Sequence, residues 1–464
     1  MLHLIENLVG GELKFGSLCH NRQVPFAGFD RAALARALAQ VADQPEDLAD
    51  AYFERREDIE LAPRERAPGL KVLREEGFAL RLVRGGTTWL ASRDVIDSFA
   101  FAQALKQVAR AWPSAAPPEP SLALGPWDGP PAAPELFGFP AAVEREIRMH
   151  HAAFPIQLTV KRHRRFVQVV GPRLVPAAEC ETFYSCRADL PWAGLELGRF
   201  GAVLPALTAV EAAAVATALV ARFRARMAPP APRGAGVVVL APAAAAVFLH
   251  EAVAHALEAD ILALGGLPEA AVGVELASAE VNVLDDPASA PGQARRVTDD
   301  EGSAVGRRWL LRQGVVEQPI ADLAWAAQSG ALVPGAGRRG SRHQPPLPRL
   351  THIELLPGDA SEADLLAGVE SGLYVPEAAR GQLDPVSGHF VLAVPHARRL
   401  RGGQPVEQVG GFRLRGSVAD LLSAVVAVGD APATSGGWCA KGGQVLPVWA
   451  TTPALRLEGV EVVG

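Results

Sequence analysis

The chain has few cysteines, no apolar run of membrane-spanning length and no large excess of charge of either sign. Its four cysteines are widely scattered along 464 residues, which argues against a disulfide framework and for a reducing compartment. The longest apolar stretch, 236–249, ends at His250, too soon to span a bilayer. The N-terminus shows no secretory signal, and the formal net charge of −6 gives no reason to expect nucleic acid as a partner. We therefore expect a cytoplasmic protein that engages neither a membrane nor nucleic acid.

Apolar residues make up 49% of the chain and charged residues 21%, which is the balance of a folded globular protein. A chain of this length is long for a single core, so two domains or one elaborate domain are expected. The proline-rich stretch 229–234 is the preferred boundary, and it gives domains at 1–230 and 231–464. The predicted fold class is α+β, with an N-terminal α/β domain (a sheet backed by helices) and a β-rich C-terminal domain.

In the N-terminal half, alternating apolar residues and a Gly-Gly turn predict an antiparallel sheet, with strands at 49–61, 70–73, 78–83 and 88–91. Helical spacing predicts helices at 30–43, 97–111, 141–152 and 210–226. Residues 113–140 are rich in proline and glycine and are expected to form a long loop. Residues 155–170 are interpreted as a hairpin with the basic run 161–165 at its tip. A solvated tip is favoured over a phosphate-binding patch, because no aromatic residues are interleaved with the basic ones.

The second half begins with a predicted strand at 237–240, followed by a helix. Beyond Asp260, short apolar runs alternate with glycine, proline and aspartate, which is typical of a β-rich domain. Strands are expected at 272–283, 309–316, 352–356, 389–394 and 412–414, and helices at 320–328, 361–371 and 418–428.

Two histidines lie in the alanine-rich helical segment 248–260 of this second domain. His250 and His255 stand at i and i+5, whereas the zinc-protease helix carries His-Glu-x-x-His with the imidazoles at i and i+4. On a regular α-helix the i+5 spacing places the side chains about 140° apart, too far to share an ion about 2.0–2.1 Å from each nitrogen. Either the pair binds no metal, or a π-type bulge at 252–254 brings the two rings together.

Three features favour a metal site over an ordinary buried polar pair. Glu251 follows His250 directly, as the base does in zinc-protease helices. Glu258 and Asp260 are placed to accept the second ring N–H of a ligating imidazole. Isolated charges are also costly on so apolar a face unless a cation pairs them. The segment is therefore interpreted as a metal-binding helix.

Catalytic zinc sites usually have three protein ligands and a water molecule, so a third ligand is needed. The glycine-rich stretch 434–444 predicts a turn that carries Cys439, and glycines allow the backbone a close approach. A thiolate there gives a two-histidine, one-cysteine set; the alternative is a free buried cysteine. Cys180 and Cys186 stand six positions apart, more than zinc-binding pairs usually do, and are interpreted as ordinary semi-buried thiols.

The stretch Leu-His-Glu-Ala-Val-Ala-His-Ala-Leu-Glu-Ala-Asp at 249–260, with Cys-Ala-Lys-Gly-Gly-Gln-Val-Leu-Pro-Val at 439–448, resembles the TldD/PmbA metallopeptidases, on the TldD side. Weaker matches follow in family order at 51–56, 299–302, 337–339, 346–351, 356–359, 381–384, 387–388 and 453–457. The resemblance implies that His250, His255 and Cys439 bind Zn2+ and that Glu251 is the general base. Alanines flank His255 where the family commonly has glycines, which leaves the local backbone shape open.

The resemblance also implies a dimer that encloses the active site, formed with a PmbA/TldE-type paralogue or with a second copy of the chain. The predicted function is a zinc-dependent peptidase that hydrolyses peptide bonds in unfolded or extended peptides, by Glu251-assisted attack of a zinc-bound water. The alternatives are a non-catalytic partner or modulator with a structural metal, and a dedicated maturation protease for one natural-product precursor. The metal site requires a helix wound wide between His250 and His255.

Overall fold

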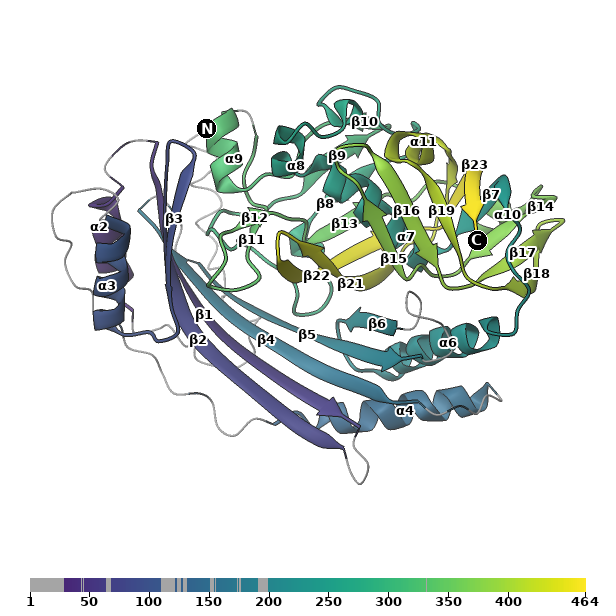
Figure 1. Cartoon of the computed structure of the whole chain (residues 1–464), viewed down its shortest axis with the longest axis horizontal. Helices are drawn as coiled ribbons and strands as arrows, with labels where there is room; N and C mark the ends of the chain where they lie inside the picture. Colours follow the sequence, from purple (N-terminus) through teal and green to yellow (C-terminus); the bar gives the residue numbers. More distant parts are fainter. Residues whose placement is uncertain are drawn as a thin grey trace.

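The computed structural model describes residues 29–42, 44, 46–63, 68–109, 122, 127, 132–150, 154, 156–172, 174, 177–190, 199–330 and 332–464. The chain mixes helices and strands, as predicted, and builds two large sheets (Figure 1). None of the helices in these ranges has the length and apolar character that a bilayer crossing requires. Most of the predicted loop at 113–140 lies outside the described residues, as does Cys19. The last residues of that predicted loop, 135–140, are not a loop but the start of a helix that was expected only from 141.

A twelve-stranded sheet runs through both halves of the chain. Its strand order is β10-β9-β8-β13-β22-β21-β6-β5-β4-β1-β2-β3. The strands span Leu48–Ala62 (β1), Gly69–Arg84 (β2), Thr87–Arg93 (β3), Leu158–Val170 (β4), Ala177–Asp189 (β5), Arg199–Leu204 (β6), Val283–Asp285 (β8), Arg308–Arg312 (β9), Val315–Val316 (β10), His352–Leu355 (β13), Ala433–Lys441 (β21) and Gln444–Thr452 (β22). The boundary predicted at residue 230 falls between strands of this one sheet, and the two-domain division stays a prediction.

The long strands β1 and β2 pair antiparallel along their whole length, from Leu48 opposite Val83 to Ala62 opposite Gly69. The two short strands predicted at 70–73 and 78–83 are therefore one continuous strand. Gly85 and Gly86 have φ of 54° and 75°, a left-handed backbone that favours glycine. They form the predicted hairpin turn into β3.

Strand β4 corrects the predicted hairpin at 155–170. The basic run 161–165 lies in the middle of one continuous strand, not at a solvated tip. Its neighbour β1 supplies acidic partners: Glu57 pairs with Arg162 at 3.0 Å, and Asp58 pairs with Lys161 at 3.0 Å. Opposite charges on neighbouring strands stabilise the pairing, so the local sequence could not reveal that these residues form a strand.

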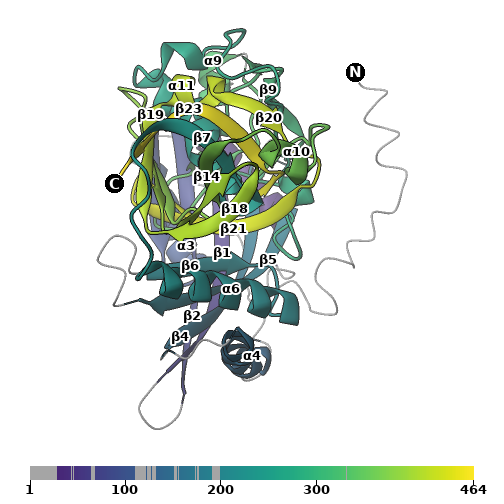
Figure 2. The same ribbon diagram turned by 90° about the vertical axis from the view of Figure 1, so that its right-hand side faces the viewer.

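Helices cover this sheet at two places (Figures 1 and 2). Helices α2 (Arg31–Ala39) and α3 (Ser98–Ala109) pack near β1–β3. Helices α4 (Glu135–Met149) and α6 (Ala209–Ala225) lie at the other end of the long strands. Asp30 caps α2, because its side chain accepts a hydrogen bond of 2.8 Å from the backbone N–H of Ala33.

The nine-stranded sheet belongs to the C-terminal half, with the order β15-β16-β19-β23-β7-β14-β17-β18 and β20 paired to β23. Its strands span Gly234–Leu240 (β7), Ser371–Val375 (β14), Arg380–Leu383 (β15), His389–Val394 (β16), Ala397–Arg401 (β17), Gln404–Val409 (β18), Phe412–Ser417 (β19), Val425–Val428 (β20) and Leu455–Val463 (β23). Helices α9 (Leu323–Ser329), α10 (Glu362–Leu366) and α11 (Val418–Ser423) overlap the three predicted helices, but α10 and α11 end earlier than expected. The two-stranded β11–β12 (Gly337–Arg338, Leu347–Pro348) forms a separate small sheet.

Several predictions in this half were wrong. The strand expected at 309–316 is a hairpin of β9 and β10. Only the last residue of the strand expected at 272–283 is in a strand, β8. The helix expected at 418–428 ends at Ser423 and is followed by β20. The alanine-rich helix α7 (Pro242–Leu249) follows β7, as predicted, and packs between β15 and the β21–β22 pair (Figure 1). The fold thus brings residues from three distant parts of the sequence to the end of α7.

Candidate metal centre

The two histidines lie where α7 changes its winding. The α-helix ends at Leu249, a π-helical segment, η1, runs from His250 to Ala254, and a 3-10 turn, η2, covers His255–Leu257. A π-helical segment inserts a residue into the turn and so rotates His255 back towards His250. The ring centroids are 5.0 Å apart and the rings nearly perpendicular, at 81°. The predicted wide helix is confirmed.

The third donor arrives from β21. Sγ of Cys439 lies 3.3 Å from Nε2 of His255, and one donor atom from each of His250, His255 and Cys439 lies within 4.8 Å of the others. The stretch that was predicted to be a turn is a strand as far as Lys441, with the turn at Gly442 and Gly443. Pairing with β22 fixes that strand and turns the thiol towards the helix.

The ring of His250 supplies the test of whether a cation fits here. The residue is buried, 8% exposed, and in the described structure neither ring nitrogen has a hydrogen-bond partner. Buried polar groups are nearly always partnered, and an imidazole nitrogen is a common metal ligand. A cation among the three donors would satisfy this ring, so the donor set fits a metal ion.

The charges around Cys439 favour a metal-binding thiolate. Burial alone raises the pKa of the thiol, but the neighbouring His250 and His255 outweigh burial and bring the pKa to about 4. A thiolate, not a thiol, is the form that binds metals. By contrast, burial raises the pKa of the Cys186 thiol to about 12. Cys186 and Cys180 lie on β5 away from the donor group, in agreement with their interpretation as ordinary thiols.

The far side of the His255 ring is held by Glu258. Nδ1 of His255 lies 2.8 Å from Oε2 of this carboxylate, which is 1% exposed. Burial raises the pKa of Glu258, but His255 and then Lys441 reverse the shift and lower the pKa to about 2. A carboxylate on Nδ1 directs Nε2 towards the metal side, the usual role of an outer partner of a ligating histidine.

The prediction for the two acidic residues is thus half right. The Glu258 carboxylate accepts a hydrogen bond from the second ring nitrogen of His255, a candidate ligand, but in the described structure Asp260 contacts neither ring. Asp260 Oδ1 instead lies 2.6 Å from Nζ of Lys441, whose ammonium group also contacts Oε2 of Glu258 at 2.9 Å. Lys441 belongs to the family-like stretch 439–448, but its contacts to the histidine segment could not be predicted from the sequence.

Glu251, the candidate base, faces the metal side of the site. Its Oε2 lies 3.9 Å from Nε2 of His255, the nitrogen that also faces Cys439. The side chain is 19% exposed, so its carboxylate can be reached by water. Strand β15 passes directly beside it: a Cβ atom added at Gly381 would lie 2.2 Å from Cγ of Glu251. The position of the base is therefore set by a glycine more than one hundred residues away in sequence.

The segment 337–349 holds the β21–β22 hairpin in place. Buried Arg349 donates a hydrogen bond of 2.8 Å to the backbone oxygen of Cys439, and Arg338 donates one of 2.9 Å to that of Pro447. The backbone N–H of Gly340 donates to Oε1 of Gln444 at 2.9 Å. This segment contains the family-like matches at 337–339 and 346–351. The sequence alone predicts no role for them, because their partners lie about a hundred residues away.

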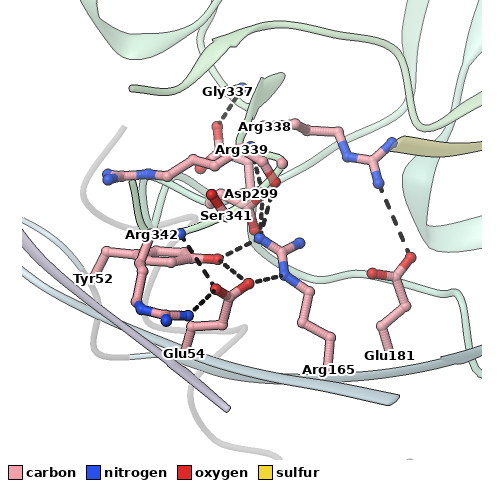
Figure 3. Close-up of polar contacts among 12 residues, drawn as sticks. Tyr52, Glu54, Arg165, Glu181, Asp299, Gly337, Arg338, Arg339, Ser341 and Arg342 are labelled. Carbon is pink, nitrogen blue, oxygen red and sulfur yellow. Dashed lines mark hydrogen bonds and ion pairs between the residues drawn. The ribbon is translucent and has the colours of Figure 1, made fainter. Parts of the chain in front are cut away.

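This segment is in turn anchored to the N-terminal sheet by buried ion pairs (Figure 3). Asp300 accepts from the backbone N–H of Arg339 at 2.8 Å and from Arg165 of β4 at 3.2 Å. Arg165 also pairs with Glu54 of β1 at 2.9 Å. Because buried charges must be paired, these contacts fix the segment against the twelve-stranded sheet. The N-terminal strands therefore support the Cys439 side of the centre from a distance.

Comparison with known protein families identifies the relationship. The sequence model described as "PmbA/TldA metallopeptidase C-terminal domain" matches residues 233–464, half of the chain. The chain belongs to the PmbA/TldD family. The match covers η1, η2 and β21, and so includes all three candidate donors.

Among curated relatives, a Haemophilus influenzae protein named "Metalloprotease TldD homolog" is 32% identical over 270 residues, 58% of this chain and 54% of that protein. A Saccharolobus solfataricus protein named "Zinc metalloprotease TldD homolog" is 27% identical over 231 residues, 49% of this chain and 51% of its own length. The chain thus spans about half the length of these relatives.

Solved structures share the fold over almost the whole chain. TldE from Thermococcus kodakarensis matches with a TM-score of 0.71 and 18% identity, covering 93% of this chain and 99% of that one. A Thermotoga maritima protein described as a putative modulator of a DNA gyrase matches with a TM-score of 0.67 and 14% identity, covering 93% and 99%. These likenesses extend the fold assignment to the N-terminal half.

Proposed function

We propose that this PmbA/TldD-family protein is a zinc-dependent peptidase in which His250, His255 and Cys439 hold the metal and Glu251 is the general base. The observation that carries the proposal is the meeting of three donor atoms within 4.8 Å at a π-helical turn. Family membership and the metalloprotease names of the relatives support it. Two nitrogens and a thiolate are a known catalytic zinc set that leaves one tetrahedral position open for water or substrate.

A zinc ion held there would supply Lewis acidity towards a peptide carbonyl and lower the pKa of a water molecule. Glu251 takes the proton from the attacking water as its oxygen bonds to the carbonyl carbon, and returns it to the amine nitrogen as the C–N bond breaks. The Glu251 carboxylate lies on the metal side of His255, with Oε2 at 3.9 Å from Nε2. Glu258 keeps the His255 ring oriented by holding Nδ1.

Extended peptides are the proposed substrates. In the described chain β15 is the outermost strand of its sheet, paired on one side with β16. Its Gly381 touches Glu251, so this edge strand passes beside the candidate base. An extended peptide can add to such an edge through backbone hydrogen bonds, whereas a folded protein offers few accessible strands. Peptides with N-methylated backbones should then be cleaved more slowly than unmodified ones of the same sequence.

The decisive test is Glu251→Gln, which keeps the shape of the side chain and removes its basicity. Peptide cleavage should fall by a factor of about 10²–10⁴, the usual contribution of a general base, while the zinc content stays unchanged. Glu280→Gln is the matched control, because Glu280 is exposed. Retained cleavage in Glu251→Gln would refute the mechanism. A zinc-free wild-type chain that cleaves peptides at full rate would refute the metal site.

Dimerisation, with a PmbA/TldE-type subunit or with a second copy, remains a prediction from the family resemblance. A cytoplasmic location remains a prediction from the scattered cysteines. Light scattering of the chain alone, and with a co-expressed PmbA/TldE-type subunit, tests the first. Cleavage should rise with the partner that forms the complex, if that complex encloses the active site.

A further inference from the structure

Lys441 is one of very few lysines in a chain that otherwise uses arginine. Lysine and arginine together number 45, and the lysines are Lys14, Lys71, Lys106, Lys161 and Lys441. The sequence therefore has a single lysine after residue 161, and that lysine stands two residues after Cys439. Lysine ends in a compact ammonium group with three donors, whereas arginine ends in a broad planar fork. A lysine here points to a contact that needs the compact group.

The contacts of Lys441 use its full donor capacity. Nζ lies 2.9 Å from Oε2 of Glu258, 2.6 Å from Oδ1 of Asp260 and 3.1 Å from the backbone oxygen of Pro348. Three N–H donors thus meet three acceptors, in a group whose side chain is only 12% exposed. A planar guanidinium could not converge on three acceptors around one nitrogen.

These contacts connect two candidate metal ligands, Cys439 and His255. Lys441 lies on the same strand as Cys439. Oε2 of Glu258 is shared between Nζ of Lys441, at 2.9 Å, and Nδ1 of His255, at 2.8 Å. His255 and Cys439 are 184 positions apart in sequence, yet Nε2 and Sγ are 3.3 Å apart. The ammonium group therefore joins the strand that carries one donor to the segment that carries the other.

We propose that Lys441 is a positioning residue, which clamps β21 to the segment after η1 so that Cys439 and His255 meet at one metal ion. The inference rests on the proposed zinc site and adds a residue that touches neither metal nor substrate. Removing the ammonium group leaves the carboxylates of Glu258 and Asp260 without the cation they share. Repulsion between these like charges then loosens the segment that holds the His255 ring.

Zinc affinity, measured by competition with a chromophoric chelator, tests this role without any activity assay. Lys441→Met should bind zinc about 10- to 100-fold more weakly, the usual effect of removing an outer partner of a metal ligand. Lys161→Met is the matched control, because Lys161 forms an ion pair of 3.0 Å with Asp58 on the N-terminal sheet. The control should bind zinc like the wild type. An unchanged affinity in Lys441→Met overturns the proposal.

Two further measurements separate positioning from general damage. Glu258→Gln should weaken zinc binding, and the double variant with Lys441→Met should lose less than the product of the two single losses, because both act through one path. A loss of zinc affinity in the double variant that equals the product of the two single losses overturns the proposal. If Lys441→Met does not fold, Lys441→Arg keeps the charge without the compact shape, and a wild-type affinity in that variant overturns the proposal equally.

Cobalt substitution gives a spectroscopic readout, since the thiolate-to-cobalt charge-transfer band reports the Cys439 bond directly. The band should be weaker in Lys441→Met at saturating cobalt, and an unchanged band counts against the role. A wild-type chain that binds no zinc refutes the metal site together with this role. A zinc-binding wild type beside an indifferent Lys441→Met refutes the role of Lys441 alone.

Discussion

Gly381 lies so close to Glu251 that a Cβ atom on the glycine would sit 2.2 Å from Cγ and 2.9 Å from Cβ of the glutamate. The contact joins β15, an edge strand of the nine-stranded sheet, to the π-helical segment that carries His250 and Glu251. Any side chain at 381 must displace either the strand or the candidate base. The position of the candidate base therefore depends on Gly381, a residue that has no side chain and takes no part in the reaction.

Gly381→Ala should lower kcat/KM for peptide cleavage by about 100-fold, because a displacement of about 1 Å in a reacting group has an effect of this size. Zinc affinity should be retained, since the donors lie on η1, η2 and β21 and not on β15. The control is Gly236→Ala on β7, where an added Cβ would have no atom within 4 Å. Steady-state kinetics and chelator competition on both variants check the prediction, and full activity in Gly381→Ala would contradict it.

Replacing Cys439 by alanine should lower the zinc bound per chain, measured by elemental analysis after desalting. The thiol pKa of about 4, which His250 and His255 set against the effect of burial, means that the thiolate is already formed at neutral pH. Its loss removes one of three donors. Cys186→Ala is the control, because that thiol is buried on β5, outside the donor group. Equal zinc stoichiometry in Cys439→Ala and the control would rule out the thiolate as a ligand.

The sequence could predict the π-helical winding because the spacing of His250 and His255 is incompatible with a shared ion on a regular helix. That inference needed only local geometry. The same holds for the β1 strand and for the Gly85–Gly86 turn, where periodicity and glycine report the local backbone. These features depend on neighbours in sequence.

The strand around Cys439 could not be predicted in this way. Glycines at 436, 437, 442 and 443 are typical of a turn, and only pairing with β22 and β6 makes 433–441 a strand. The basic run of β4 likewise becomes a strand because acidic partners arrive from β1, about a hundred residues earlier. Arg349 and Lys441 were missed as supports for the same reason. Apart from the hairpin between β21 and β22, contacts between distant segments set these features, and local propensity does not record them.

Zinc removal should lower the thermal stability of the chain, because the ring nitrogens of buried His250 have no hydrogen-bond partner among the described residues. At a free zinc concentration of about 1,000 times Kd, binding should contribute about 4 kcal/mol. Unfolding followed by circular dichroism, with and without chelator, measures the difference. His250→Ala should abolish it, whereas His343→Ala, at an exposed position, should preserve it. A chelator effect of equal size in His250→Ala would place the stabilising zinc elsewhere.

Asp300→Asn should destabilise the fold by about 3–5 kcal/mol at neutral pH, the usual effect of breaking a buried ion pair. The Asp300 carboxylate is fully buried and accepts from Arg165 and from Arg296, the latter at 2.6 Å. Burial raises its pKa, but these arginines outweigh burial and hold the pKa well below its usual range. Its contribution is therefore complete above the unfolded pKa of about 3.9 and is lost as the pH falls towards the folded value.

The stability difference between the wild type and Asp300→Asn should therefore be constant from about pH 5 upwards and shrink as the pH falls below about 4. Urea unfolding at pH 7, 5 and 3 measures it. Asp359→Asn, at an exposed position, should match the wild type throughout. A difference that grows at low pH would mean that Asp300 is protonated in the folded protein. The ion pairs that tie segment 337–349 to β4 would then lack their central charge, and the support of Cys439 from the N-terminal sheet would have to come through other residues.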